Sequence, residues 1–297
     1  MIKKAIVTGA TGFIGFNLVK RLLLENWDVD IIIRKNSDIS LLKCLSPLIN
    51  VYVYDENFES LNTALSYSKP NVIFHLASFF KSDHDSNEIN HLIYSNILFG
   101  TQLLEAMSKN NIVNLVNTGT SWEHFENSTY NPVNLYAATK HAFQDIIFYY
   151  INTKKINCIT LKLYDTYGEN DNRAKLLKIL KQVYISGETL QMTAGEQLFN
   201  LVHINDVIDA FMLASHYLII NNKYINSSYA VSAKSLISLK QLVDLIEQII
   251  QHPLPIEWGE KNYKEREVMI PWNNGITLPG WQPQMELMHG LSIYFSK

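Results

Sequence analysis

Residues 1–15 read Met-Ile-Lys-Lys-Ala-Ile-Val-Thr-Gly-Ala-Thr-Gly-Phe-Ile-Gly, and this stretch decides the fold. The apolar run at residues 4–7 predicts a short buried strand, and apolar side chains at helical spacing over residues 13–25 predict a helix. Gly9 to Gly12 must then form the turn that joins them. Such a turn points backbone N–H groups and the positive end of a helix at one place, where a pyrophosphate can bind.

Each glycine of this turn has its own physical reason. Gly9 permits the tight turn, Gly12 leaves no side chain between backbone and phosphate, and Gly15 lets the helix lie close to the strand. The spacing is Gly-x-x-Gly-x-x-Gly, and the alternative interpretation is a glycine-rich turn without a ligand. The order strand, turn, helix favours a dinucleotide site. We expect its contacts to come from Gly9, Thr11, Gly12, Phe13, Ile14 and Gly15.

Composition limits the other possibilities. The 297 residues are 47% apolar and 18% charged, with a formal charge of −3 and no long basic run, so nucleic acid and anionic membranes are unexpected partners. Cys44 and Cys158 are far apart in sequence, which suggests neither a disulfide framework nor a metal site and fits a cytoplasmic protein. No apolar run approaches the roughly 18 residues of a membrane span, and the early glycine motif leaves no room for a signal peptide.

Strands and helices alternate along the first half of the chain. Apolar or alternating runs predict strands at residues 29–33, 51–54, 71–76 and 113–117, and an amphipathic helix covers residues 93–107. This alternation predicts an α/β fold with a doubly wound parallel sheet, covered by helices on both faces.

The ends of these strands supply further cofactor contacts. Arg34 and Lys35 follow the second strand, where a cation suits a 2′-phosphate and a carboxylate suits a 2′-hydroxyl, so they favour NADP(H) over NAD(H). The alternative is two solvated charges. His75 is interpreted as a packed histidine. Ala77 and Ser78 follow the fourth strand, and small residues there would let the backbone pass beside the cofactor.

Tyr136 and Lys140 form the candidate catalytic pair. They are four residues apart, so they share one face of a helix that continues to about residue 150. A nearby ammonium and a hydroxyl donor stabilise a phenolate and lower its pKa, and Thr120 could supply the hydroxyl. The same spacing recurs at Tyr150 and Lys154, which we interpret as a surface decoy at the helix end.

Together these motifs resemble the extended short-chain dehydrogenase/reductase family of NAD(P)-dependent sugar-nucleotide epimerases, dehydratases and reductases. The resemblance implies a Rossmann sheet, with Tyr136 as acid/base, Lys140 on the nicotinamide ribose and Thr120 positioning the reacting oxygen. It also implies that Asp55 contacts adenine. The remaining expected cofactor contacts are Glu56, Leu76 and Asn96. The resemblance also implies a homodimer. We expect a cofactor-binding domain over residues 1–165 with a return near 200–230. Residues 166–199 and 231–297 would form a smaller substrate-binding α/β region.

The second half departs from the family pattern at the expected phosphate site. Phe199 and Asn200 stand where the family has an arginine and an aspartate, and Glu169 replaces a usual proline. Arg266 matches a second phosphate-binding arginine, the alternative being a surface ion pair with a neighbouring glutamate. Lys175, Lys178 and Lys181 are interpreted as a solvated helix face. The expected substrate contacts are Lys81, Thr120, Ser121, Asp165, Arg173, Gln197 and Arg266.

The C-terminal part resembles a subgroup of the family, the CDP-abequose and CDP-paratose synthases, in residues 256–259, 266–269 and 280–283. This implies NADPH-dependent reduction of the C4 keto group of a nucleotide-linked deoxy- or dideoxyhexose for bacterial surface polysaccharide. A 4,6-dehydratase is disfavoured because Ser121 and Trp122 occupy the places of its acidic pair. A 4-epimerase, an inactive NADP-binding sensor and a reductase of a small carbonyl remain as alternatives.

Overall fold

The computed structural model describes residues 3–221 and 225–296, so residues 1–2 of the opening stretch and 222–224 of the expected return segment lie outside it. Its centre is a seven-stranded sheet in the order β11-β6-β5-β4-β1-β2-β3. Every neighbouring pair is parallel, which confirms the predicted fold class. The strands are β1 (Lys4–Thr8), β2 (Asp28–Arg34), β3 (Ile49–Tyr54), β4 (Val72–His75), β5 (Asn114–Thr120), β6 (Asn157–Leu163) and β11 (Asn226–Val231).

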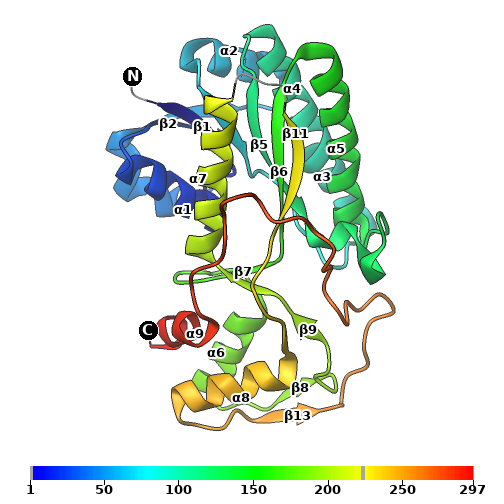
Figure 1. The fold of residues 1–297 in the computed structure, drawn as a ribbon. Helices are drawn as coiled ribbons and strands as arrows, with labels where there is room; N and C mark the ends of the chain where they lie inside the picture. Colours follow the sequence, from blue (N-terminus) through cyan, green and yellow to red (C-terminus); the bar gives the residue numbers. More distant parts are fainter. Residues whose placement is uncertain (1–2, 222–224, 297) are drawn as a thin grey trace.

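Helices cover both faces of this sheet (Figure 1). One layer holds α1 (Phe13–Leu24) and α7 (Ile204–Ile220); the other holds α2 (Phe58–Ser68), α4 (Phe99–Lys109) and α5 (Leu135–Lys154). The chain adds β2 and β3 on one side of β1 and then β4, β5 and β6 on the other. The strand order therefore reverses beside β1, and a crevice at such a point is where α/β sheets bind ligands.

The helix expected at residues 93–107 is longer and irregular. It comprises α3 (Ile89–Ile93), a π-helical turn η3 (Tyr94–Leu98) and α4. Asn96 lies in the π turn, and such turns are frequent at functional sites. Other short helical turns are η1 (Ser40–Leu48), η2 (Ser86–Glu88), η4 (Ser121–Glu123) and η5 (Phe125–Asn127).

A smaller lobe lies beyond the carboxyl ends of the strands (Figure 1). Leu180, Leu242, Ile246 and Leu291 belong to its own buried core, separate from the two cores on the sheet faces. Its elements are β7 (Asp165–Tyr167), α6 (Leu176–Ser186), β8 (Leu190–Met192), β9 (Leu198–Phe199), β10 (Leu201–His203), β12 (Ile237–Ser238), α8 (Leu239–Ile250), β13 (Ile256–Trp258) and α9 (Leu287–Phe295).

Residues 259–286, which we call the strap, contain no helix or strand and run from the lobe back to the sheet before returning to α9 (Figure 1). Trp281 of the strap donates its indole N–H to the Asp206 carbonyl at 2.9 Å. The Asp206 carboxylate accepts the backbone N–H groups of Gln284 and Met285 at 2.9 and 3.1 Å. The strap therefore ties the two parts together, while the expected domain boundaries remain a prediction.

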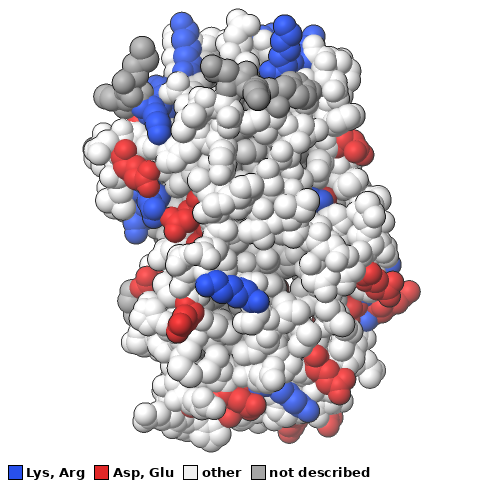
Figure 2. All heavy atoms as spheres, in the orientation of Figure 1, with Lys and Arg blue, Asp and Glu red and all other residues white. Residues whose placement is uncertain are grey.

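The surface agrees with the modest net charge. On the face in Figure 2, basic and acidic side chains are scattered among one another without a region of a single sign. Within residues 3–221 and 225–296, no helix has both the length and the apolar character needed to cross a bilayer. Cys44 is exposed, Cys158 is buried, and both are free thiols.

Candidate active site

The glycine turn has the geometry that a pyrophosphate requires. Gly9 has φ of +71°, and a Cβ there would lie 2.6 Å from the backbone nitrogen of Ala77. A Cβ on Gly15 would lie 2.1 Å from the Gly9 carbonyl oxygen, so α1 approaches β1 too closely for any side chain. The first turn of α1 has no side-chain cap and no acidic residue. Its backbone N–H groups therefore remain available to an anion, and the turn fits a dinucleotide.

His75, at the end of β4, is a packed residue. Its Nδ1 lies 2.9 Å from the Thr8 hydroxyl oxygen, which also accepts the N–H of Ala77 at 3.2 Å. Burial, together with the charge of Lys140, lowers the pKa of His75 to about 3. The imidazole is therefore neutral and fixes the backbone that passes beside the expected cofactor.

Asn96 joins the β4 end to the candidate catalytic helix. Its Oδ1 accepts the Ser78 hydroxyl at 2.9 Å and the Phe79 N–H at 2.8 Å. Its Nδ2 donates to the Phe79 carbonyl at 3.0 Å and to the Thr139 hydroxyl at 2.9 Å. Because these protein groups occupy the amide, Asn96 positions the segment containing Ser78 relative to α5, and we assign it that role.

Tyr136 and Lys140 project from the first two turns of α5. The helix begins after Asn134, whose Oδ1 accepts the Ala137 N–H at 3.0 Å. Burial and the charge of Glu123 raise the pKa of Tyr136 to about 12, against a hydrogen bond with Ser78 and the charge of Arg173. The phenol is therefore protonated at neutral pH, as a proton donor must be.

Lys140 is the most unusual cation of the site because only 2% of its surface is exposed. Burial lowers the pKa of its ammonium from 10.5 to about 8, against the opposing effect of the Glu123 carboxylate. Both residues of the Tyr-x-x-x-Lys motif thus lie in a weakly polar environment. A hydrogen-bonding partner, such as the ribose hydroxyls of a cofactor, would stabilise the charged lysine there.

The second copy of the motif has a different environment. Tyr150 is 7% exposed and donates its hydroxyl to Glu105 Oε2 at 2.9 Å, so describing it as a surface residue was wrong. Burial, followed by that hydrogen bond, raises the pKa of Tyr150. Lys154 is exposed at the end of α5. Tyr136 is half-buried and Lys140 is buried, whereas in the second copy only the tyrosine is buried.

Thr120 ends β5, the strand beside β4, and α5 packs against this strand. Its Oγ1 accepts the Trp122 N–H at 3.3 Å, which leaves the hydroxyl proton available for donation. Its own N–H donates to Glu123 Oε1 at 3.0 Å. Thr120 and Ser121 are 8% and 7% exposed, so the end of this strand is largely withdrawn from solvent.

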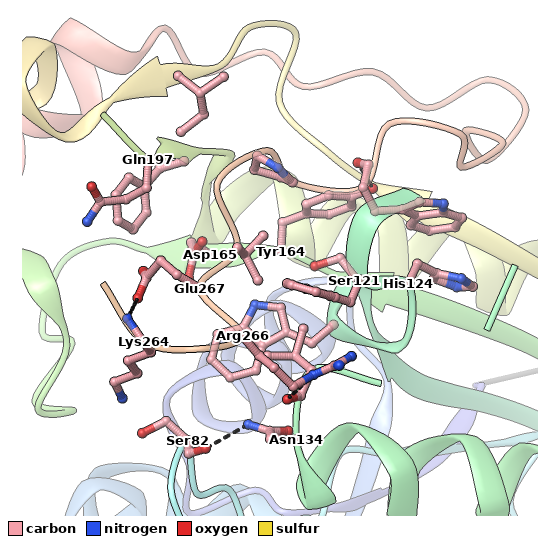
Figure 3. Close-up of a pocket in the computed structure, with 18 of the residues that line it drawn as sticks. Ser82, Ser121, His124, Asn134, Tyr164, Asp165, Gln197, Lys264, Arg266 and Glu267 are labelled. Carbon is pink, nitrogen blue, oxygen red and sulfur yellow. Dashed lines mark hydrogen bonds between the residues drawn. The ribbon is translucent and has the colours of Figure 1, made fainter. Parts of the chain in front are cut away.

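A cavity of about 660 Å³ opens beside this strand end. In Figure 3, Arg266 lies near Asn134 at the start of α5, and Ser121 and Asp165 line the same space. Burial raises the pKa of Asp165, against the charges of Lys175 and Arg173. The wall from the lobe and the strap includes Gln197, Leu198, Phe199, Lys264, Pro271 and Trp272.

Arg266 retains an uncompensated positive charge. Its Nη2 donates to Asn131 Oδ1 at 2.6 Å and to the Pro132 carbonyl at 2.9 Å, and its Nε donates to the Val133 carbonyl at 3.2 Å. The guanidinium lies 4.3 Å from the Phe125 ring centroid. Within the described part of the chain it has no ion pair, so the alternative of a salt bridge with a neighbouring glutamate was wrong.

Lys175 was assigned to a solvated face, and the structure corrects this. It stands immediately before α6, and its ammonium lies 6.0 Å from the centroid of Phe80, whose ring meets Tyr136 edge-on at 4.9 Å. Burial, followed by the charge of Arg173, lowers the pKa of Lys175. The sequence does not distinguish Lys175 from Lys178 and Lys181, because the three lysines share one spacing. In the structure Lys178 and Lys181 donate to the backbone carbonyls of Asn172 and Tyr294.

Other expected site residues are occupied by protein contacts. Arg173 binds both oxygens of Asp171 at 2.7 Å, and its guanidinium lies 4.6 Å from the Phe13 ring centroid, beside the glycine turn. Lys81 forms an ion pair with Glu88 at 2.6 Å. Gln197 exchanges hydrogen bonds with the Thr193 hydroxyl at 3.0 and 3.2 Å.

The expected adenosine contacts lie at the surface. Arg34 ends β2 and Lys35 follows it; both are exposed, and neither takes part in an ion pair within the described residues. Asp55 is exposed and accepts the Asn57 N–H at 3.1 Å before α2. Glu56 is exposed with φ of +68°. Leu76, Ala77 and Ser78 follow β4, beside Gly9.

A family model, the NAD dependent epimerase/dehydratase family, matches residues 5–222. The chain belongs to this family. A CDP-abequose synthase from Yersinia pseudotuberculosis is 29% identical over 274 residues, covering 90% of this chain and 91% of that relative. Among solved structures, UDP-glucose 4-epimerase from Thermotoga maritima with UDP-glucose has a TM-score of 0.86 at 19% identity, covering 99% of this chain and 97% of that one. UDP-glucose 4-epimerase from Thermus thermophilus with NAD has a TM-score of 0.80 at 18% identity, covering 99% and 98%. These structures establish the shared Rossmann fold of the family.

Proposed function

We propose that this chain is an NADPH-dependent 4-ketoreductase of a nucleotide-linked deoxy- or dideoxyhexose in surface polysaccharide biosynthesis, with CDP as the nucleotide. The observation that carries the proposal is that Thr120 ends β5 and that Tyr136 and Lys140 lie at the start of α5, while the adjacent residues Ser121 and Asn134 line a cavity of about 660 Å³. The relative named CDP-abequose synthase, which is matched over most of both chains, supports the choice of substrate.

The residues have separable tasks in this reaction. The glycine turn would bind the pyrophosphate of NADPH, Lys140 would bind the nicotinamide ribose, and NADPH would supply hydride when bound. Tyr136, protonated at neutral pH, donates its proton to the C4 oxygen. The hydroxyl of Thr120 donates a hydrogen bond to the same oxygen and stabilises the charge that develops on it.

We assign the substrate diphosphate to Arg266 and Lys175. The arginine that the family places at position 199 is phenylalanine here, and Phe199 lines the cavity. Arg266 is a cation on the wall of the cavity. Lys175 is a cation beside Phe80, and it has no ion pair within the described residues. A diphosphate would compensate both charges. We also assign Arg34 and Lys35 to the 2′-phosphate of NADPH, because both are exposed cations at the carboxyl end of β2.

The test is NADPH oxidation with a panel of CDP-, dTDP- and GDP-linked 4-keto-deoxy sugars, repeated with NADH. We expect oxidation equal to the product formed with a CDP-linked sugar, a preference for NADPH, and loss of turnover in Tyr136→Phe. Tyr150→Phe is the matched control because it removes the hydroxyl of the second motif copy. Cofactor binding without conversion of any sugar in the panel would count against the proposal and favour a sensor.

A 4-epimerase is the second candidate. It is supported by the relative named UDP-glucose 4-epimerase from Mycolicibacterium smegmatis, which is 23% identical over 320 residues. An epimerase oxidises and reduces one carbon and regenerates its cofactor in each turnover. Conversion of a sugar without net oxidation of NADPH would therefore identify this reaction instead.

A further inference from the structure

Glu123 is a buried carboxylate that neither the glycine motif nor the tyrosine motif accounts for. It has no exposed surface and lies three residues after Thr120, in the turn η4. Its Oε1 accepts the Thr120 N–H at 3.0 Å. Its Oε2 accepts Lys162 Nζ at 2.9 Å, from β6, and lies 3.1 Å from His141 Nδ1, on α5. Three elements that surround the candidate active site therefore meet at one carboxylate.

The same network reaches the wall of the cavity. Lys162 Nζ also donates to His124 Nε2 at 2.6 Å, and the other ring nitrogen of His124 donates to the Ser128 carbonyl at 3.1 Å. The His124 ring stacks on Trp272 with centroids 4.0 Å apart and an interplanar angle of 19°. Trp272 belongs to the strap and lines the cavity. Glu123 is thus connected to the strap through Lys162 and His124.

The backbone makes room for this cluster. A Cβ on Gly119 would lie 3.1 Å from Lys162 Cγ and 3.2 Å from Glu123 Oε1. Burying a carboxylate and an ammonium together is a poor way to gain stability, because their desolvation offsets much of their attraction. A pair of apolar side chains of similar volume would stabilise the fold at least equally. A role in geometry explains better why the charges lie directly behind the reacting strand end.

We propose that Glu123 is a positioning residue: anchored by Lys162 and His141, it fixes the backbone of Thr120 and couples it, through His124, to the Trp272 wall of the substrate cavity. The inference rests on the proposed function for its kinetic consequences. The hydrogen bond that the Thr120 N–H donates to the charged Glu123 carboxylate can be measured in the absence of substrate and reaction.

The charge of Glu123 also affects the proton donor. It raises the pKa of Tyr136 after the larger effect of burial, while the Ser78 hydroxyl and Arg173 oppose it; Lys140 lies on the same helix. Burial alone would raise the pKa of Glu123, but His141 and Lys162 hold it below its ordinary value, so the carboxylate is charged at neutral pH. Replacing it by a neutral amide therefore lowers the pKa of Tyr136.

The first test is the kinetics of Glu123→Gln. We expect kcat to fall by about tenfold to a hundredfold, the range for a displaced reacting group, with KM for the sugar retained. The decline of kcat at alkaline pH should move to lower pH, because Glu123 raises the pKa of Lys140, which is about 8, and the pKa of Tyr136, which is about 12. Glu105→Gln is the matched control, because Glu105 is another carboxylate that accepts a hydrogen bond, from the Tyr150 hydroxyl, but does not line the cavity. A pH profile and kcat equal to those of the original chain would overturn the proposal.

Glu123→Gln alone leaves the Lys162 ammonium buried without its carboxylate, which could destabilise the fold. The double variant Glu123→Gln with Lys162→Met removes both buried charges and so separates a loss of stability from a loss of positioning. If it folds and still shows the lower kcat and the shifted profile, the positioning role is supported; recovery of the original kcat would contradict it.

The second test is the amide proton signal of Thr120 in threonine-labelled protein, assigned with Thr120→Ser. An upfield shift in Glu123→Gln is expected because the charge-assisted hydrogen bond is lost. An unchanged signal refutes the inference even if no sugar in the panel is a substrate.

Discussion

Lys140→Met is expected to stabilise the protein at neutral pH while abolishing reduction. The ammonium is 2% exposed, and burial lowers its pKa from 10.5 to about 8. The folded chain therefore holds this proton more weakly than the unfolded chain does. Below about pH 8 both states carry the charge, and the full cost of burying it opposes folding.

The magnitude follows from the pKa difference. A change from 10.5 to about 8 corresponds to about 3 kcal/mol of folding free energy at pH 6.5. The cost shrinks as the pH rises from about 8 towards 10.5, because the folded state then becomes neutral; about 1 kcal/mol remains at pH 9.5. Methionine has a similar length and no charge, so it should recover most of this energy.

The assay is urea unfolding of both proteins at pH 6.5 and pH 9.5, without cofactor. We expect Lys140→Met to be the more stable protein, by about 3 kcal/mol at the lower pH and about 1 kcal/mol at the higher. Lys154→Met, on the exposed end of the same helix, should change stability little at either pH. Equal or lower stability of Lys140→Met at pH 6.5 would refute the argument that this lysine is retained for function at a cost in stability.

Three further variants test the binding sites. Gly9→Ala should weaken NADPH binding by about tenfold or more, measured by cofactor fluorescence, because its Cβ would lie 2.6 Å from the Ala77 nitrogen. Gly187→Ala has the same left-handed strain, at φ of +68°, but nothing within 4 Å of its Cβ, so it should retain affinity. Replacing Arg34 and Lys35 by alanine should reduce the kcat/KM ratio of NADPH to NADH by about tenfold or more, and an unchanged ratio would remove their assigned role. Arg266→Ala should raise KM for the nucleotide sugar about tenfold, whereas Lys178→Ala should leave it unchanged; substrate affinity unaltered in Arg266→Ala would contradict the phosphate assignment.

Much of the fold could be predicted because its signals are local. The glycine turn, the apolar strands and the spacing of Tyr136 and Lys140 specify the parallel sheet and the face of α5, and the structure contains them. The π turn around Asn96 was missed because its geometry depends on partners far along the chain, among them Thr139. The periodicity of apolar residues does not distinguish such a turn from regular helix.

The rest of the site depends on tertiary contacts that sequence spacing does not reveal. Lys175 has the same spacing as two surface lysines, yet only Lys175 lies over Phe80. Glu123 and Lys162 are 39 positions apart and meet because β5 and β6 are neighbours in the sheet. Arg266 reaches the segment before α5 only because the strap crosses back from the lobe to the sheet.

The most direct test of the proposed reaction is the fate of deuterium from NADPH that carries deuterium at both positions of the nicotinamide C4. With a CDP-linked 4-keto-deoxy sugar, we expect deuterium at C4 of the product sugar in an amount equal to the cofactor oxidised, and none in Tyr136→Phe. A product without deuterium at C4, or cofactor oxidation without a reduced sugar, would contradict the assignment of this chain as a 4-ketoreductase.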